Sequence, residues 1–150
     1  MAMHTWFECK IRYEKVMENG MQKKVTEPYL VDALSFTEAE ARIIEEMTPF
    51  ISGEFTVSDI KRANYSELFP SDEESADRWF KCKLIFITLD EKSGAEKKTS
   101  TQVLVQAADL RDAVKKLDEG MKGTMADYQI GMVSETPLMD VYPCLLYTSD

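Results

Sequence analysis

The sequence of residues 6–70 recurs, in diverged form, as residues 79–143. Residues 6–10 read WFECK, and residues 79–83 read WFKCK. Because Trp and Cys are scarce in most proteins, their return in one five-residue frame indicates an internal duplication. Further identities support it: Gly20, Lys23, Lys24, Leu30, Val31, Ala33, Ala39, Glu45 and Met47 match Gly94, Lys97, Lys98, Leu104, Val105, Ala107, Ala113, Glu119 and Met121. A chain of this kind should fold as two copies of one small unit.

Each copy begins with a predicted β-hairpin. Apolar and polar residues alternate along residues 6–16, and residues 80–86 repeat the pattern, which is typical of a half-buried strand. Gly20 and Gly94 follow these strands, and glycine tolerates the positive φ angles of tight turns. The chain is therefore expected to fold back into second strands over residues 23–33 and 97–107.

A helix and a third strand complete each predicted copy. Ser35 and Asp109 are suitable N-cap residues, and apolar residues at helical spacing follow both of them. Alternating residues then predict third strands near residues 55–60 and 128–132.

The pattern predicts an α+β fold built by tandem duplication of a ββαβ unit, with mainly antiparallel sheets and local strand order 2-1-3. We expect one compact domain over residues 1–143, with repeats 6–70 and 79–143 packed about a pseudo-twofold axis and joined by an acidic connection, 71–78. Residues 64–70 and 137–143 continue past the third strands with apolar side chains. We expect both to pack across the repeat boundary.

Composition narrows the classes of function. The chain has 150 residues and a net charge of −9, which argues against general binding to duplex nucleic acid. No apolar run is long enough to span a bilayer, and no secretory signal is recognisable, so a cytoplasmic protein is expected. Cys9 and Cys82 lie at equivalent strand positions and are interpreted as small buried residues, with a metal or redox role as the alternative.

Residues 144–150 (CLLYTSD) have no counterpart after Pro70. They resemble one reading frame of a transposase adapter used in preparing sequencing libraries. We interpret them as a non-native tail and expect the true residues after Pro143 to be missing.

Three stretches carry a resemblance to a known family: residues 6–10, 25–41 and 60–65. They resemble DUF4494, an uncharacterised family of small proteins from gut anaerobes and from phages or mobile elements. The resemblance extends over nearly the whole chain to Pro143. It implies a phage- or mobile-element-associated accessory role, and it assigns no activity or catalytic residue.

Few residues are suited to catalysis. His4 is the only histidine and lies near the N-terminus, so a Ser-His or Cys-His nucleophile pair would depend on a frayed segment. The chain has no glycine-rich phosphate loop and no Cys or His spacing that suits zinc. We therefore expect a non-enzymatic protein with no cofactor and no metal site. Acid-base catalysis by carboxylates alone is the remaining enzymatic alternative.

Residues preserved in both copies form the candidate ligand site. Alternation places Trp6 and Lys10 on the sheet face opposite Phe7, and the second copy repeats this arrangement. An indole beside ammonium groups suits an aromatic anion such as a nucleotide. The predicted ligand-binding residues are Trp6, Lys10, Lys23, Lys24, Trp79, Lys83, Lys97 and Lys98. The alternative is structural, with tryptophans that pack and lysines that protect sheet edges.

Two functions follow from these residues. The first is capture of an anionic, nucleotide-like ligand between the repeats. The second is an acidic protein-interaction module that engages a basic host protein. Both leave open whether the protein forms a homo-oligomer.

Overall fold

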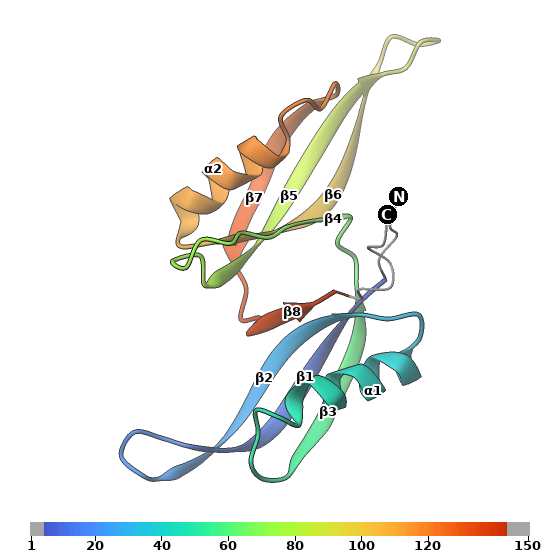
Figure 1. Cartoon of the computed structure of the whole chain (residues 1–150). Coiled ribbons are helices and arrows are strands. Elements are labelled where there is room, and N and C mark those ends of the chain that lie inside the picture. The colour runs from blue at the N-terminus through green and yellow to red at the C-terminus, as the bar shows by residue number, and fades with distance from the viewer. Residues whose placement is uncertain (1–4, 144–150) are drawn as a thin grey trace. The chain divides into compact units, whose positions relative to one another are not determined.

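The computed structural model describes residues 5–143 and confirms the α+β class (Figure 1). Two helices and eight strands, arranged in two mixed sheets, make up this part of the chain. The chain divides into two compact units. Unit 1 contains the residues up to Asn64 and those from Pro137 onward, and unit 2 contains Tyr65–Thr136.

Unit 1 has one four-stranded sheet and one helix. Its elements are β1 (Trp6–Val16), β2 (Gln22–Asp32), α1 (Phe36–Met47), β3 (Phe55–Ala63) and β8 (Asp140–Tyr142). The strand order is β3-β1-β2-β8. β1 pairs antiparallel with both β2 and β3.

Unit 2 has the same arrangement. Its elements are β4 (Glu67–Phe69), β5 (Arg78–Leu89), β6 (Glu96–Ala107), α2 (Leu110–Gly120) and β7 (Asp127–Glu135). The strand order is β4-β6-β5-β7. The first long strand lies between the second and third in both units, so the predicted local order 2-1-3 is confirmed.

The two short strands are exchanged between the halves of the sequence. β4 follows β3 in the chain, yet it pairs in parallel with β6. β8 follows β7, yet it pairs in parallel with β2 (Figure 1). The segments after the third strands therefore pair with the sheet of the other half of the sequence. The sequence predicted that they pack across the repeat boundary, but not that they form strands.

Local sequence signals account for the turns and the helix starts. Gly20 and Gly94 have φ angles of +82° and +71° at the hairpin turns, a region that favours glycine. At the start of α1, the Ser35 Oγ accepts a hydrogen bond from the Glu38 amide, and the Glu38 carboxylate accepts one from the Leu34 amide. The Ser35 hydroxyl thus caps α1 by satisfying an amide that has no partner within the helix, while the Glu38 carboxylate accepts from the residue before the N-cap.

Each unit has its own hydrophobic core between the helix and the sheet. The two cores correspond: Phe7, Cys9, Ile11, Val31, Ala39 and Ile43 in unit 1, and Phe80, Cys82, Leu84, Val105, Ala113 and Leu117 in unit 2. Cys9 and Cys82 are fully buried free thiols, which confirms the prediction that they are buried. Burial is the main cause that raises the pKa of Cys9 to about 12 and that of Cys82 to about 11.

Some sequence predictions concern residues outside the described part of the chain. His4 and the tail, residues 144–150, belong to this group. The single compact domain over residues 1–143 and its pseudo-twofold packing stay predictions.

Candidate functional site

The two predicted tryptophans begin the central strands of the two sheets. Trp6 lies opposite Asp32 in the β1–β2 pairing, and Trp79 lies opposite Gln106 in the β5–β6 pairing. Their side chains are 2% and 5% exposed, respectively. Stacking a ligand on either indole would require that ring to become accessible.

Lys10 and Lys83 lie farther along the same strands. Each is four residues after its tryptophan, a spacing of about 13 Å along a strand. The pairing with the third strand shifts by one residue immediately after each lysine, between Lys10 and Ile11 and between Lys83 and Leu84. Lys10 is partly buried and Lys83 is exposed.

The remaining four predicted lysines are exposed near the hairpin ends. Lys23 lies opposite Lys15, and Lys97 lies opposite Thr88. Lys15 and Thr88 are each nine residues after the tryptophan of their strand, which is about 30 Å along the strand. The structure therefore does not bring Lys23, Lys24, Lys97 or Lys98 to the indole of its own unit. Ligand binding by the eight residues stays a prediction.

A groove in unit 1 does combine one predicted lysine with aromatic side chains. Lys24 lines a cavity of about 620 Å³ together with Arg12, Tyr13 and Phe55. Two carboxylates, Glu14 and Glu54, also line it, so its cations have acidic neighbours. Arg12 and Phe55 were not predicted as site residues, because neither belongs to the signature that the copies share.

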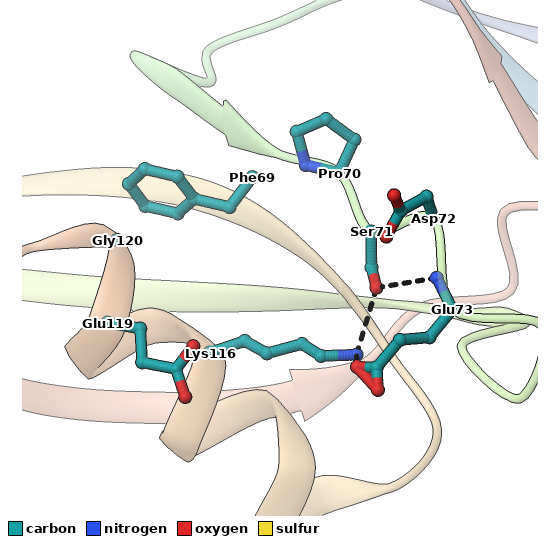
Figure 2. A pocket seen from close by; sticks show the side chains of 8 residues that line it. All are labelled: Phe69, Pro70, Ser71, Asp72, Glu73, Lys116, Glu119 and Gly120. Atoms are coloured by element: carbon teal, nitrogen blue, oxygen red, sulfur yellow. Dashed lines mark hydrogen bonds and ion pairs between the residues drawn. The ribbon is translucent and has the colours of Figure 1, made fainter.

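A cavity of about 820 Å³ in unit 2 lies beside the C-terminal half of α2 (Figure 2). Its central feature is Lys116, whose Nζ lies 2.7 Å from a Glu73 oxygen, 3.0 Å from an Asp112 oxygen and 3.1 Å from the Ser71 Oγ. Burial alone would lower the Lys116 pKa, but the hydrogen bonds with the two carboxylates outweigh it and raise the pKa. The carboxylates of Glu73 and Asp112 thus neutralise the Lys116 ammonium. Its contacts with Ser71 and Glu73 join part of the acidic connection to α2.

Unit 1 contains a polar cluster on the core side of its sheet. Glu27 is 8% exposed and accepts hydrogen bonds from Tyr13 at 2.9 Å, Tyr29 at 3.3 Å and Lys15 at 3.4 Å. Burial, followed by the hydrogen bond to Glu27, raises the pKa of Tyr13 to about 12. Burial and the Glu27 charge raise the Tyr29 pKa further. Both phenols therefore remain protonated donors at neutral pH, and sequence reasoning did not identify this cluster.

Four apolar side chains on α1 and in its two flanking loops are exposed, although the Phe36 ring also packs edge-on against Phe7 of the core. Leu34 is 70% exposed, Phe36 51%, Ile44 42% and Phe50 77%. Glu40 and Glu45 are exposed on the same helix. We call these residues the α1 surface: Leu34, Phe36, Glu40, Ile44, Glu45 and Phe50.

The corresponding helix of unit 2 has a different surface. α1 contains four glutamates and one arginine, whereas α2 contains three acidic and three basic residues. Counted from the N-caps Ser35 and Asp109, the positions of Ile44 and Phe50 are occupied by Asp118 and Thr124. The excess of glutamates and the apolar residues at the Ile44 and Phe50 positions therefore distinguish α1, whereas Leu110 of α2 is exposed at the position of Phe36. The sequence analysis predicted an acidic interaction module but did not identify the exposed apolar residues of the α1 surface.

A comparison with protein-family models gives one match, which covers residues 5–144. The matching model is described as a domain of unknown function, DUF4494. The chain belongs to this family. Neither a curated protein nor a solved structure matches this DUF4494 chain.

Two further properties bear on function. Within residues 5–143 of the DUF4494 chain, no group of three or more His, Cys, Asp or Glu side chains is placed to hold a metal ion. Neither described helix has the length and apolar character needed to cross a membrane.

Proposed function

We propose that this DUF4494 chain is a protein-interaction module whose α1 surface binds a basic partner. The observation that carries the proposal is the exposure of four large apolar side chains on and beside a helix whose charged residues are mostly glutamates. A solvent-exposed helix face normally carries polar side chains, so a group of exposed apolar residues bordered by charge is typical of a binding surface.

Burial of these side chains can supply the affinity. Full burial of a Leu, Ile or Phe side chain contributes roughly 1.5–3 kcal/mol relative to exposure. Phe50 and Leu34 are mostly exposed, and Phe36 and Ile44 are about half exposed. Covering them would therefore stabilise a complex, although association entropy offsets much of the gain.

The glutamates determine the chemistry of the partner. Glu40 and Glu45 are exposed, and neither α1 nor α2 has a basic residue in its last turn. A partner with Lys or Arg around an apolar centre would be complementary to this surface. Electrostatic steering would make association fast and sensitive to salt.

The test uses a defined probe, a synthetic amphipathic helical peptide of Leu and Lys. We expect saturable binding by the full chain, with an affinity that falls as salt is raised. Ile44→Ser/Phe50→Ser should weaken binding at least tenfold, because it removes two apolar contacts. Leu110→Ser on α2, where Leu110 is 52% exposed, is the matched control and should bind as the parent does. Equal loss in the α2 control, or binding that does not depend on α1, contradicts the proposal.

A second candidate function is capture of an anionic, nucleotide-like ligand. The groove that holds Lys24 and Arg12 beside Tyr13 and Phe55 favours it, because aromatic rings can stack on a base while cations hold a phosphate. A thermal-shift series with nucleotides tests this function. Arg12→Ala/Lys24→Ala should abolish the shift, whereas Lys97→Ala/Lys98→Ala should not.

We also infer that the two units arose by tandem duplication. Equal strand orders and equal pairings in the two units support this inference. A pseudo-twofold arrangement, association with phages or mobile elements, and cytoplasmic location remain proposals that rest on sequence.

A further inference from the structure

The two units differ in side-chain volume at matching positions of their cores. In unit 1, Cys9 lies opposite Tyr29, and Ile11 lies opposite Glu27. In unit 2, Cys82 lies opposite Val103, and Leu84 lies opposite Thr101. A phenol ring and a carboxylate side chain in unit 1 are thus replaced by an isopropyl group and a small hydroxyl side chain in unit 2.

A third difference occurs on the helices. Glu46 is eleven residues after the N-cap of α1, and Gly120 is eleven residues after the N-cap of α2. The Phe69 ring lies directly against Gly120, since a Cβ added there would be 2.9 Å from the ring (Figure 2). Unit 2 therefore has smaller residues than unit 1 at three matching positions: Val103 for Tyr29, Thr101 for Glu27 and Gly120 for Glu46.

A cavity of about 450 Å³ is present in this region of unit 2. Its apolar wall is formed by side chains from β4, β5, β6 and the end of α2: Phe69, Leu84, Phe86, Val103 and Met121. Small ligands occupy cavities of this size when apolar walls are combined with a few polar groups.

Apart from Glu67, the polar side chains that line the cavity are hydroxyls. The Thr101 Oγ1 donates a hydrogen bond to the Ser66 Oγ at 2.8 Å, and the Ser66 Oγ donates one to the Gln102 carbonyl at 3.2 Å. Glu67 is the one charged residue among those that line the cavity. No lining cation is available to neutralise an anion, so the wall favours a neutral molecule.

From these observations we propose that the cavity of unit 2 binds a small neutral phenol, whose ring occupies the place that Tyr29 fills in unit 1. In unit 1, the phenol ring of Tyr29 lies against the sheet and stacks on the aromatic residue of the short parallel strand. In unit 1 that residue is Tyr142, with ring centroids 6.1 Å apart. In unit 2 the corresponding residue is Phe69, since Val105 pairs with Phe69 as Val31 pairs with Tyr142. The hydroxyls of Thr101 and Ser66 replace Glu27 as the hydrogen-bonding partners of the phenol.

The experiment follows methionine methyl signals of the full chain during titration with 4-methylphenol. Met121 lines the cavity, and Met47 holds the matching helix position in unit 1. We expect a saturable ring-current shift of the Met121 methyl and no shift of the Met47 methyl. Shifts of both signals, or of neither, overturn the proposal.

Variants separate the phenol hydroxyl from the ring. Thr101→Val should weaken binding of 4-methylphenol by roughly three- to tenfold, the expected effect of one lost hydrogen bond, and should leave toluene binding unchanged. Thr88→Val, on the exposed part of β5, is the matched control and should leave both affinities unchanged. Equal affinity of the parent chain for toluene and 4-methylphenol overturns the assignment to phenols.

A side chain that fills the cavity of unit 2 should prevent binding of 4-methylphenol. Val103→Tyr restores the residue of unit 1 and should abolish the Met121 shift. If this core substitution prevents folding, Thr124→Phe at the exposed rim narrows the cavity from outside and should weaken binding. Undiminished binding in a folded filled or narrowed variant contradicts the proposal.

Discussion

Leu30 of β2 lies opposite Val141 of β8 in a parallel pairing. Leu104 of β6 lies opposite Leu68 of β4 in the same way. Each half of the sequence thus contributes one short strand to the sheet of the other half. The chain therefore passes between the two units twice, once between β3 and β4 and once between β7 and β8.

This exchange predicts that a cut connection will not release the halves. A specific protease site placed between Glu74 and Ser75, which are both exposed, should yield two fragments that stay together. Each fragment keeps a strand paired in the other's sheet, and those backbone hydrogen bonds do not depend on the connection. Native mass spectrometry and gel filtration after cleavage should show one complex of both fragments. Separate fragments under native conditions would show that β4 and β8 contribute too little to hold them.

The contact between Phe69 and Gly120 predicts a penalty for a single added methyl group. Gly120→Ala should destabilise the protein by about 1–2 kcal/mol, because the Cβ would lie 2.9 Å from the Phe69 ring and overpacking outweighs the gain in helix propensity. Urea unfolding measures the change. Gly53→Ala is the control, since its Cβ would meet nothing within 4 Å, and it should change stability by less than about 0.5 kcal/mol.

A double variant checks that the Phe69 ring is the cause. Phe69→Leu/Gly120→Ala should lose less stability than the sum of the two single changes, because the smaller side chain relieves the clash. If the stability losses of the two single changes are additive, the cost of Gly120→Ala arises in the helix backbone and not from the Phe69 ring.

Most of the fold could be predicted from local sequence patterns. The alternation that contains Phe7 and Cys9 identifies a strand by itself, and Gly20 marks its turn. Ser35 and Asp109 cap their helices as expected, because capping depends on residues that are close in sequence.

The parts that could not be predicted depend on residues far apart in sequence. β4 has three residues, too few for alternation to specify a partner or a register. Lys116 of α2 forms an ion pair with Glu73 of the connection, and Tyr13 donates a hydrogen bond to Glu27 across a hairpin. Charged and aromatic residues are common on helix surfaces, in connections and in hairpins. Residue type alone therefore does not indicate which of these side chains contact one another.

The burial of Tyr13, together with its hydrogen bond to Glu27, predicts a loss of stability in alkaline solution. The Tyr13 pKa is raised from 10 to about 12 in the folded protein, so the folded state binds this proton more tightly than the unfolded state. Its contribution is complete below pH 10 and is lost as the pH rises from about 10 to 12. Tyr13→Phe should reduce the slope of unfolding free energy against pH in this window. An unchanged slope would show that Tyr13 titrates normally in the folded state.

The buried thiols predict slow alkylation of the folded protein. Thiolate is the reactive form, and pKa values of about 12 for Cys9 and about 11 for Cys82 leave very little of it at neutral pH. In a Cys144→Ser variant, so that only these two thiols report, iodoacetamide should label neither residue under native conditions and both in concentrated guanidinium chloride. Mass spectrometry of the intact protein counts the added groups. Rapid labelling of either cysteine without denaturant would contradict its burial beneath the helix of its unit.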